Sequence, residues 1–191
     1  MNRLKPSANG IYAGVWASNV NFGTGADGTS TEVDYYGGYS GTFGCGSCSY
    51  KAGFIYYRYE GDKNLDYIEG AVSVTFAGVT AGLNYSPAYL GDYGKLATGD
   101  DVALFYPYIN YSYALPADIS LSLHGAYNGM SEKGLFEAGQ DDYSEWSVGL
   151  AKAFGGINFG LTYWDTNTHS LPGFLSADGG ARVVFSASKT L

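Results

Sequence analysis

The sequence predicts an all-β fold, a closed antiparallel up-and-down transmembrane β-barrel of about ten strands. The 191 residues form one domain, with residues 1–9 as an N-terminal extension. Two observations lead to this prediction. Segments of about ten residues alternate apolar and polar side chains, which is the period of a strand with two different faces. The connections between these segments alternate between short and long, as in a barrel whose two ends face different surroundings.

Ten such segments follow one another along the chain. Each is close to the roughly 9–11 residues that cross a bilayer at a tilt. An even number of strands also lets both termini lie on the same side of the membrane. The expected strands cover residues 10–20, 31–43, 50–60, 65–76, 79–87, 102–115, 118–128, 143–154, 157–165 and 181–191.

The connections support an antiparallel order. Tight turns are expected at Ala77-Gly78, Pro116-Ala117 and Gly155-Gly156, and we assign them to the periplasmic end. The longest connections, 128–142 and 166–180, are polar, and we assign them to the extracellular end.

The two faces of a strand are clear in residues 118–128, where Leu121 and Leu123 oppose Ser122 and His124. Periodicity alone leaves open which face points outward. An apolar interior would make a soluble lipocalin-like barrel, whereas an apolar exterior would make an outer-membrane barrel. The polar faces carry mainly Ser, Thr, Asn, Gly and Ala, which suit a narrow interior better than a water-facing surface. This composition favours the membrane interpretation.

Aromatic residues near the expected strand ends give a further reason. Tyr and Trp are enriched where a membrane meets water. We therefore expect outward-facing girdles formed by Tyr12, Trp16, Tyr35, Tyr59, Tyr67, Tyr143, Trp146 and Trp164.

The overall composition excludes several classes of protein. Charged residues are 15% and aromatic residues 17% of the chain, which is unlike a disordered sequence. The net charge of −8, without a basic stripe, argues against nucleic acid as a partner. No segment approaches the roughly 18 consecutive apolar residues of a membrane helix.

Charged and titratable side chains on the polar faces are candidates for the interior of the barrel. Arg58 and Glu69 lie on neighbouring strands, where they could pair inside the lumen. One hypothesis is that the interior charges form a ring that tunes ion preference. The other is that they pair across strands and plug the interior. The candidates are Arg58, Glu69, Glu32, Asp34, His124, Glu145 and Arg182.

Cys45 and Cys48 form a CxxC motif in a turn. Two cysteines without a neighbouring histidine are too few for a four-ligand zinc site, and no helix follows as in a thioredoxin-type motif. We expect a local disulfide in an oxidising compartment, with a redox-active or metal-bound pair as the alternatives.

No catalytic residue, metal site or cofactor is predicted. His124 could serve a barrel enzyme together with a serine or an acid. However, no G-x-S-x-G motif occurs, and no local spacing fixes a partner for this histidine. We therefore expect His124 to be a structural or lumen-lining residue.

Four segments carry a resemblance to a known family. The chain resembles the Gcw_chp proteins, also called the TorF family of suggested porins, which implies a Gram-negative outer-membrane β-barrel with a channel role. Family members usually carry about two further strands before the first of these segments, so the resemblance implies either that this chain is a shortened form or that its N-terminal pair is absent. The segments are GIYAGVWASNVNF (10–22), EVDYYGGYSG (32–41), GFIYYRYEG (53–61) and LDYIEGAVSV (65–74).

These observations predict a small barrel of the bacterial outer membrane that acts as a porin or narrow channel. Its expected partners are the lipid bilayer and permeating ions or small solutes, and its excess of acids would favour cations. Two alternatives remain open. One is a soluble lipocalin-like barrel that binds an apolar ligand, and the other is a structural membrane barrel that does not conduct.

Overall fold

The fold is one antiparallel sheet, and the computed structural model describes it for residues 9–20, 30–135, 141–168 and 180–189. Within these ranges the strands pair in sequence order, so each strand lies between its sequence neighbours. The prediction of an all-β up-and-down fold with ten strands is confirmed. The strands are β1 (Gly10–Asn19), β2 (Thr31–Phe43), β3 (Cys48–Glu60), β4 (Tyr67–Phe76), β5 (Val79–Ser86), β6 (Leu104–Leu115), β7 (Ile119–Met130), β8 (Tyr143–Phe154), β9 (Ile157–Thr166) and β10 (Arg182–Ser188).

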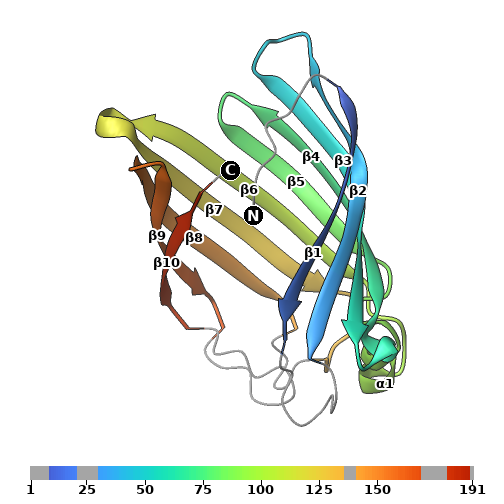
Figure 1. Cartoon of the computed structure of the whole chain (residues 1–191). Helices are drawn as coiled ribbons and strands as arrows, with labels where there is room; N and C mark the ends of the chain where they lie inside the picture. Colours follow the sequence, from blue (N-terminus) through green and yellow to red (C-terminus); the bar gives the residue numbers. More distant parts are fainter. Residues whose placement is uncertain (1–8, 21–29, 136–140, 169–179, 190–191) are drawn as a thin grey trace.

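Tight turns and long connections alternate along the sheet, as the sequence predicts. The turns after β4 and β8 are Ala77-Gly78 and Gly155-Gly156, and all four residues have positive φ. Such values match the right-handed twist of a hairpin. A single-turn helix, η3 (Pro116–Asp118), joins β6 to β7. The turns lie at one end of the sheet and the long connections at the other (Figure 1).

One short helix, α1 (Gly91–Thr98), lies between β5 and β6 at the end with the long connections (Figure 1). It ends at Gly99, whose φ of 95° suits glycine and whose N–H donates to the Lys95 carbonyl. A second short helix, η2 (Lys63–Leu65), packs beside it. Among the described residues, no helix is both long and apolar enough to cross a membrane.

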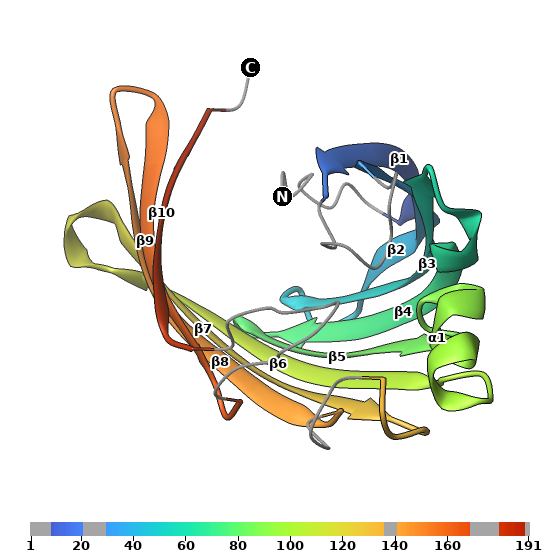
Figure 2. The ribbon, with the colours of Figure 1, turned by 90° about the horizontal axis from the view of Figure 1, so that it is seen from below.

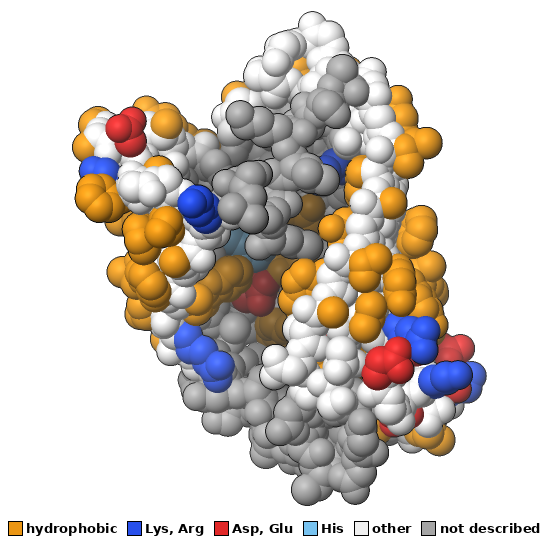
Figure 3. Space-filling view, viewed as in Figure 1, with side chains coloured by type: hydrophobic (Ala, Val, Ile, Leu, Met, Phe, Trp, Pro, Cys, Tyr) orange, Lys and Arg blue, Asp and Glu red, His pale blue; other side chains and the backbone are white. Residues whose placement is uncertain are grey.

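The register places most large apolar side chains on the convex face of the sheet. Directly paired residues share a face, so Leu123, Val148 and Tyr163 form one row across β7, β8 and β9. These rows are exposed, with Leu161 at 55% and Phe185 at 67%. Hydrophobic side chains accordingly cover the outer flanks in Figure 3. A lipocalin-like barrel has the opposite arrangement, with its apolar side chains inside.

The sheet curves into an incomplete ring, with β1 and β10 as its edges (Figure 2). No pairing joins these two strands within the described residues, so the predicted closed barrel is not present in this structure. Closure requires strand number, tilt and stagger to agree. β10 ends at Ser188 after seven residues, so its edge is shorter than the predicted segment 181–191. Residues 1–8 of the predicted N-terminal extension lie outside the described ranges.

The predicted aromatic girdles are wrong for most of the residues named. Only Tyr35 and Trp146 of that set lie on the convex face. The reason is that the first strands carry aromatic residues on both faces, so position near a strand end does not decide orientation. By register, the concave face instead holds Tyr12, Trp16, Tyr59, Tyr67, Tyr143 and Trp164.

Candidate functional site

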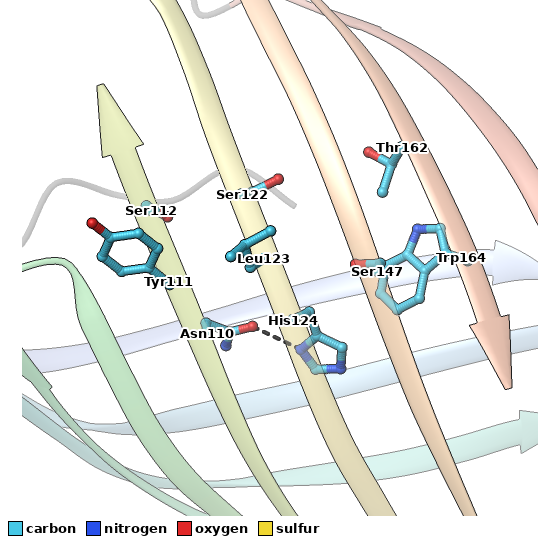
Figure 4. A pocket seen from close by; sticks show the side chains of 9 residues that line it. All are labelled: Asn110, Tyr111, Ser112, Ser122, Leu123, His124, Ser147, Thr162 and Trp164. Atoms are coloured by element: carbon cyan, nitrogen blue, oxygen red, sulfur yellow. Dashed lines mark hydrogen bonds between the residues drawn. The ribbon is translucent and has the colours of Figure 1, made fainter. Parts of the chain in front are cut away.

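A row of polar residues crosses the concave face at the middle of four strands. Asn110 of β6 pairs with His124 of β7, which pairs with Ser147 of β8 and then Trp164 of β9. The residues of this row line a shallow pocket of about 190 Å³. Figure 4 shows them around the pocket, and its lining also includes Ser112, Ser122 and Thr162. We call this region the open patch.

The His124 ring is held by three side chains. Its Nδ1 lies 2.7 Å from Asn110 Oδ1, and its Nε2 lies 3.3 Å from both Glu145 Oε1 and the Tyr106 hydroxyl. Tyr106 also donates to the Glu145 carboxylate. Because an amide oxygen only accepts, Nδ1 donates. Because Tyr106 donates its single proton to Glu145, it cannot also donate to Nε2, so Nε2 can bond to the Glu145 and Tyr106 oxygens only as a donor.

This geometry differs from that of a hydrolase triad. No serine hydroxyl is among the partners of His124 in the part of the chain described, and the Ser122 hydroxyl donates to the Gly149 carbonyl instead. The described residues also hold no group of three His, Cys, Asp or Glu side chains that could bind a metal ion. The arrangement can offer hydrogen bonds, but it lacks an activated nucleophile.

Aromatic rings flank the polar row of the open patch. The Trp164 ring centroid is 5.4 Å from that of His124, and the Tyr108 centroid is 6.5 Å away. Tyr108 lies flat over Gly82, its direct partner on β5, where an added Cβ would collide with the ring. A glycine opposite an aromatic residue allows this flat placement. Ring faces and hydrogen-bonding groups thus lie side by side on one wall.

A second region of the concave face is filled by the protein's own side chains, and we call it the packed patch. Tyr57 and Tyr67 stack at 4.5 Å, and Tyr89 meets the edge of Tyr67 at 5.1 Å. Leu65 and Leu90 are fully or almost fully buried against this cluster. Burial raises the pKa of Tyr89 above its ordinary value, which keeps the hydroxyl protonated. The packed patch fills the concave face near α1 and near the ends of β3 and β4 that lead into the long connections.

Glu69 lies beside the packed patch. It is 5% exposed and accepts hydrogen bonds from Asn84 Nδ2 at 2.9 Å and from Tyr57. A buried carboxylate needs such donors, because its desolvation is otherwise costly. Glu69 is therefore a satisfied structural group in this structure.

The pairing predicted for Arg58 is wrong. Arg58 lies opposite Val33 on the convex face, and its guanidinium pairs with Glu60 at 3.0 Å. Aromatic residues occupy both faces of the segment 50–60, so alternation there gives no unique register. Glu69 faces the other side of the sheet and cannot meet Arg58.

The other predicted interior residues lie on the concave face, but few of them meet. Glu32 and Asp34 lie on β2, where the Tyr59 hydroxyl bonds to Glu32. Of the predicted candidates, His124 and Glu145 lie together, with Nε2 3.3 Å from Oε1. Arg182 of β10 lies opposite Trp164 at the margin of the open patch.

Sequence reasoning missed several residues of the concave face. Lys51 lies on the concave face, with its Nζ 5.2 Å from the centre of the Tyr12 ring. Tyr106 and Asn110 were not singled out either. The turn between β6 and β7 signals the position of Asn110 only with its observed three-residue length, which pairs Leu115 with Ile119 and places Asn110 opposite His124. The expected two-residue turn would place Asn110 opposite Leu123.

The connections at the two ends of the sheet are tied by different bonds. Cys45 and Cys48 form a disulfide in the β2–β3 turn, with Cα atoms 5.5 Å apart. In the β7–β8 loop, Lys133 Nζ lies 2.5 Å from Asp142 Oδ2, and the Met130 N–H donates to Asp142 Oδ1 at 2.9 Å. These two bonds hold the pKa of Asp142 below its ordinary value.

Comparison with known proteins gives one match. The model of the Gcw_chp family, described as bacterial proteins of unknown function, matches residues 5–189. No curated protein and no solved structure matches the chain. The match covers nearly the whole sequence, and the chain therefore belongs to the Gcw_chp family.

Proposed function

We propose that the protein is a β-barrel of the bacterial outer membrane that gives small polar solutes a narrow, passive path. The observation that supports this most is the division of the sheet into two faces. Large apolar side chains are exposed across the convex face, while hydroxyl, amide and charged groups line the concave face. In water such an apolar surface would cause association, whereas in a bilayer it is the lipid-contacting surface.

The extent of the apolar surface fits a membrane. Along β4 the convex positions run from Ile68 to Phe76 without a charge. These eight steps span about 27 Å along the strand, or about 21 Å at a tilt of about 40°, close to the roughly 25 Å apolar band of membrane barrels. Convex charges lie towards the margins, with Arg58 and Glu60 at the loop end and Lys152 at the turn end.

In the membrane, the barrel closes by pairing β1 with β10. Open edges would leave unpaired backbone groups in lipid, at a cost of several kcal/mol each. A cysteine scan tests this, with Ala13→Cys on β1 combined in turn with Val183→Cys, Phe185→Cys or Ala187→Cys on β10. One spontaneous cross-link among the three pairs would identify the register. Absence of any cross-link in folded protein would contradict closure between these strands.

Membrane insertion is tested first by extraction. The protein should partition with outer membranes, require detergent for extraction, and migrate differently on a gel before and after boiling, as folded barrels do. Recovery of folded protein in the soluble fraction without detergent would contradict the proposal.

Conduction is tested in planar bilayers. We expect a small conductance with cation preference, because acids outnumber bases on the concave face. Lys51→Gln should increase that preference, while Arg58→Gln on the convex face is the matched control and should not change it. Equal shifts of the reversal potential in both variants would refute the assignment of the concave face as the path.

A structural barrel without conduction is the second candidate. The packed patch favours it, since Tyr57, Tyr67 and Tyr89 fill part of the concave face. A folded, membrane-inserted protein that never conducts and does not admit sugars into vesicles would support this candidate over the channel.

A further inference from the structure

We infer that the open patch is a binding site for a neutral sugar, such as a single hexose or one residue of an oligosaccharide. The inference deepens the proposed function, because it names the class of solute for the same path. It relies on that proposal only for how the sugar reaches the site.

The aromatic rings of the open patch match the apolar faces of a sugar ring. Trp164 is 37% exposed although it lies on the concave side, and Tyr108 is held flat by Gly82. The C–H groups on the face of a pyranose are apolar and slightly positive, and the face of an aromatic ring is negative. A sugar in the pocket can therefore stack on Trp164, which lines it, while Tyr108 lies beside the polar row outside the pocket lining.

The polar groups between the rings match the edge of a sugar. Hydroxyl and amide groups both donate and accept, as sugar hydroxyls do, and the patch carries both kinds of group. A site of this type combines apolar contact with a few polar groups that fix orientation. The polar residues that line the pocket are Asn110, Ser112, Ser122, Ser147 and Thr162, of which Ser147 is buried and Ser122 already donates to the Gly149 carbonyl.

The charges near the open patch favour a neutral ligand over an ion. Glu145 already accepts from Tyr106 and lies 3.3 Å from His124 Nε2. Both side chains are largely buried, so a cation or an anion would have to break this internal pair. The pocket of about 190 Å³ is suited to one sugar ring and too small for a folded peptide.

Binding is tested by calorimetry and tryptophan fluorescence on the folded protein. The detergent should be a polyoxyethylene ether, because maltoside and glucoside head groups would compete. The probes are glucose, maltose and N-acetylglucosamine, with choline and phosphate as charged comparisons. We expect saturable binding of at least one sugar and a change in fluorescence on binding.

Two tryptophan variants form the matched test. Trp164→Ala should weaken sugar binding by roughly tenfold, which corresponds to about 1.4 kcal/mol and lies within the range of an aromatic contact. Trp164→Phe should restore part of it, and it keeps the test valid if the alanine variant fails to fold. Trp146→Phe on the convex face should bind like the wild type.

The outcomes separate this inference from the proposed function. Conduction without binding of any sugar would overturn the sugar site and leave the channel intact. Sugar binding without conduction would support the binding site and contradict the proposed channel function. Tighter binding of choline or phosphate than of every sugar, or equal loss in the Trp164 and Trp146 variants, would also overturn the inference.

Discussion

Alternation of apolar and polar side chains along the strands produces both faces of the sheet. The two faces differ in how uniform their composition is. The convex face is apolar almost throughout, from Ile11 on β1 to Phe185 on β10. The concave face is divided into the packed patch, which the protein fills itself, and the open patch, which it leaves accessible. A lipid-facing surface needs only apolarity, whereas an interior must combine packing with access. Under the proposed function, any specificity for a solute would therefore lie on the concave side.

Removal of a ring from the packed patch should have the largest effect on stability. Tyr67→Ala deletes a side chain that contacts Tyr57, Tyr59 and Tyr89, and we expect a loss of about 3–5 kcal/mol of unfolding free energy. Tyr113→Ala on the convex face should cost only about 1 kcal/mol. Urea unfolding in lipid vesicles measures both. Similar losses would show that the two faces do not differ in packing.

Two adjacent valines test the faces themselves. Val183 faces outward and Val184 faces inward, and both are well exposed. Val183→Lys should destabilise the inserted protein by about 2 kcal/mol, because it places a charge in lipid. Val184→Lys should change stability by about 0.5 kcal/mol or less. The reverse order, measured by vesicle unfolding, would invert the assignment of the faces.

Two glycines test the flat tyrosine of the open patch. Gly82→Ala would displace the Tyr108 ring from the concave face and lower the free energy of unfolding by about 1–3 kcal/mol. Gly70→Ala is the matched control on β4, where an added Cβ meets no atom closer than 3.8 Å, and it should be nearly neutral. Thermal unfolding compares them. If the control is as destabilising as Gly82→Ala, contact with Tyr108 is not the cause.

The smallest effect concerns the loop beyond the open patch. The lowered pKa of Asp142 gives the folded state stability that is complete above pH about 3.8 and lost as the pH falls through the folded value. Because the pair with Lys133 is exposed, the total should be below about 1 kcal/mol. Amide exchange at Met130, corrected for its intrinsic rate, measures it. Asp142→Asn should abolish this pH dependence. If the pH dependence persists in that variant, another titrating group causes it.

The architecture was largely predictable from the sequence, because alternation and turn chemistry are local. The residues Ala77-Gly78 and Gly155-Gly156 predicted two of the turns. The alternation in the segment 118–128 predicted which of its side chains share a face. Closure was not predictable, since it depends on the stagger summed over all strands. The helix α1 was also missed, because its eight residues carry no clear apolar stripe.

The open patch was predictable only in part. His124 and Glu145 followed from strand alternation, but their contact depends on the register between β7 and β8. The prediction that Arg58 lies on the interior face was wrong, because aromatic residues on both faces of β3 hide the alternation. Trp164 was expected at the outer surface, because its type and its place near a strand end resemble a girdle residue. Composition cannot tell whether an aromatic ring serves lipid or an interior.

The strictly sequential pairing of the strands has a consequence for how the sheet assembles. In the described sheet each strand pairs with a sequence neighbour, so each of these additions closes only a small loop and loses little chain entropy, and the proposed pairing of β1 with β10 is the one step that closes a long loop. The sheet can therefore grow hairpin by hairpin, with the newest strand as the template for the next. Cleavage of the connection between β7 and β8 would interrupt one such step but leave the pairing surfaces intact, and the two fragments should still recombine into one sheet.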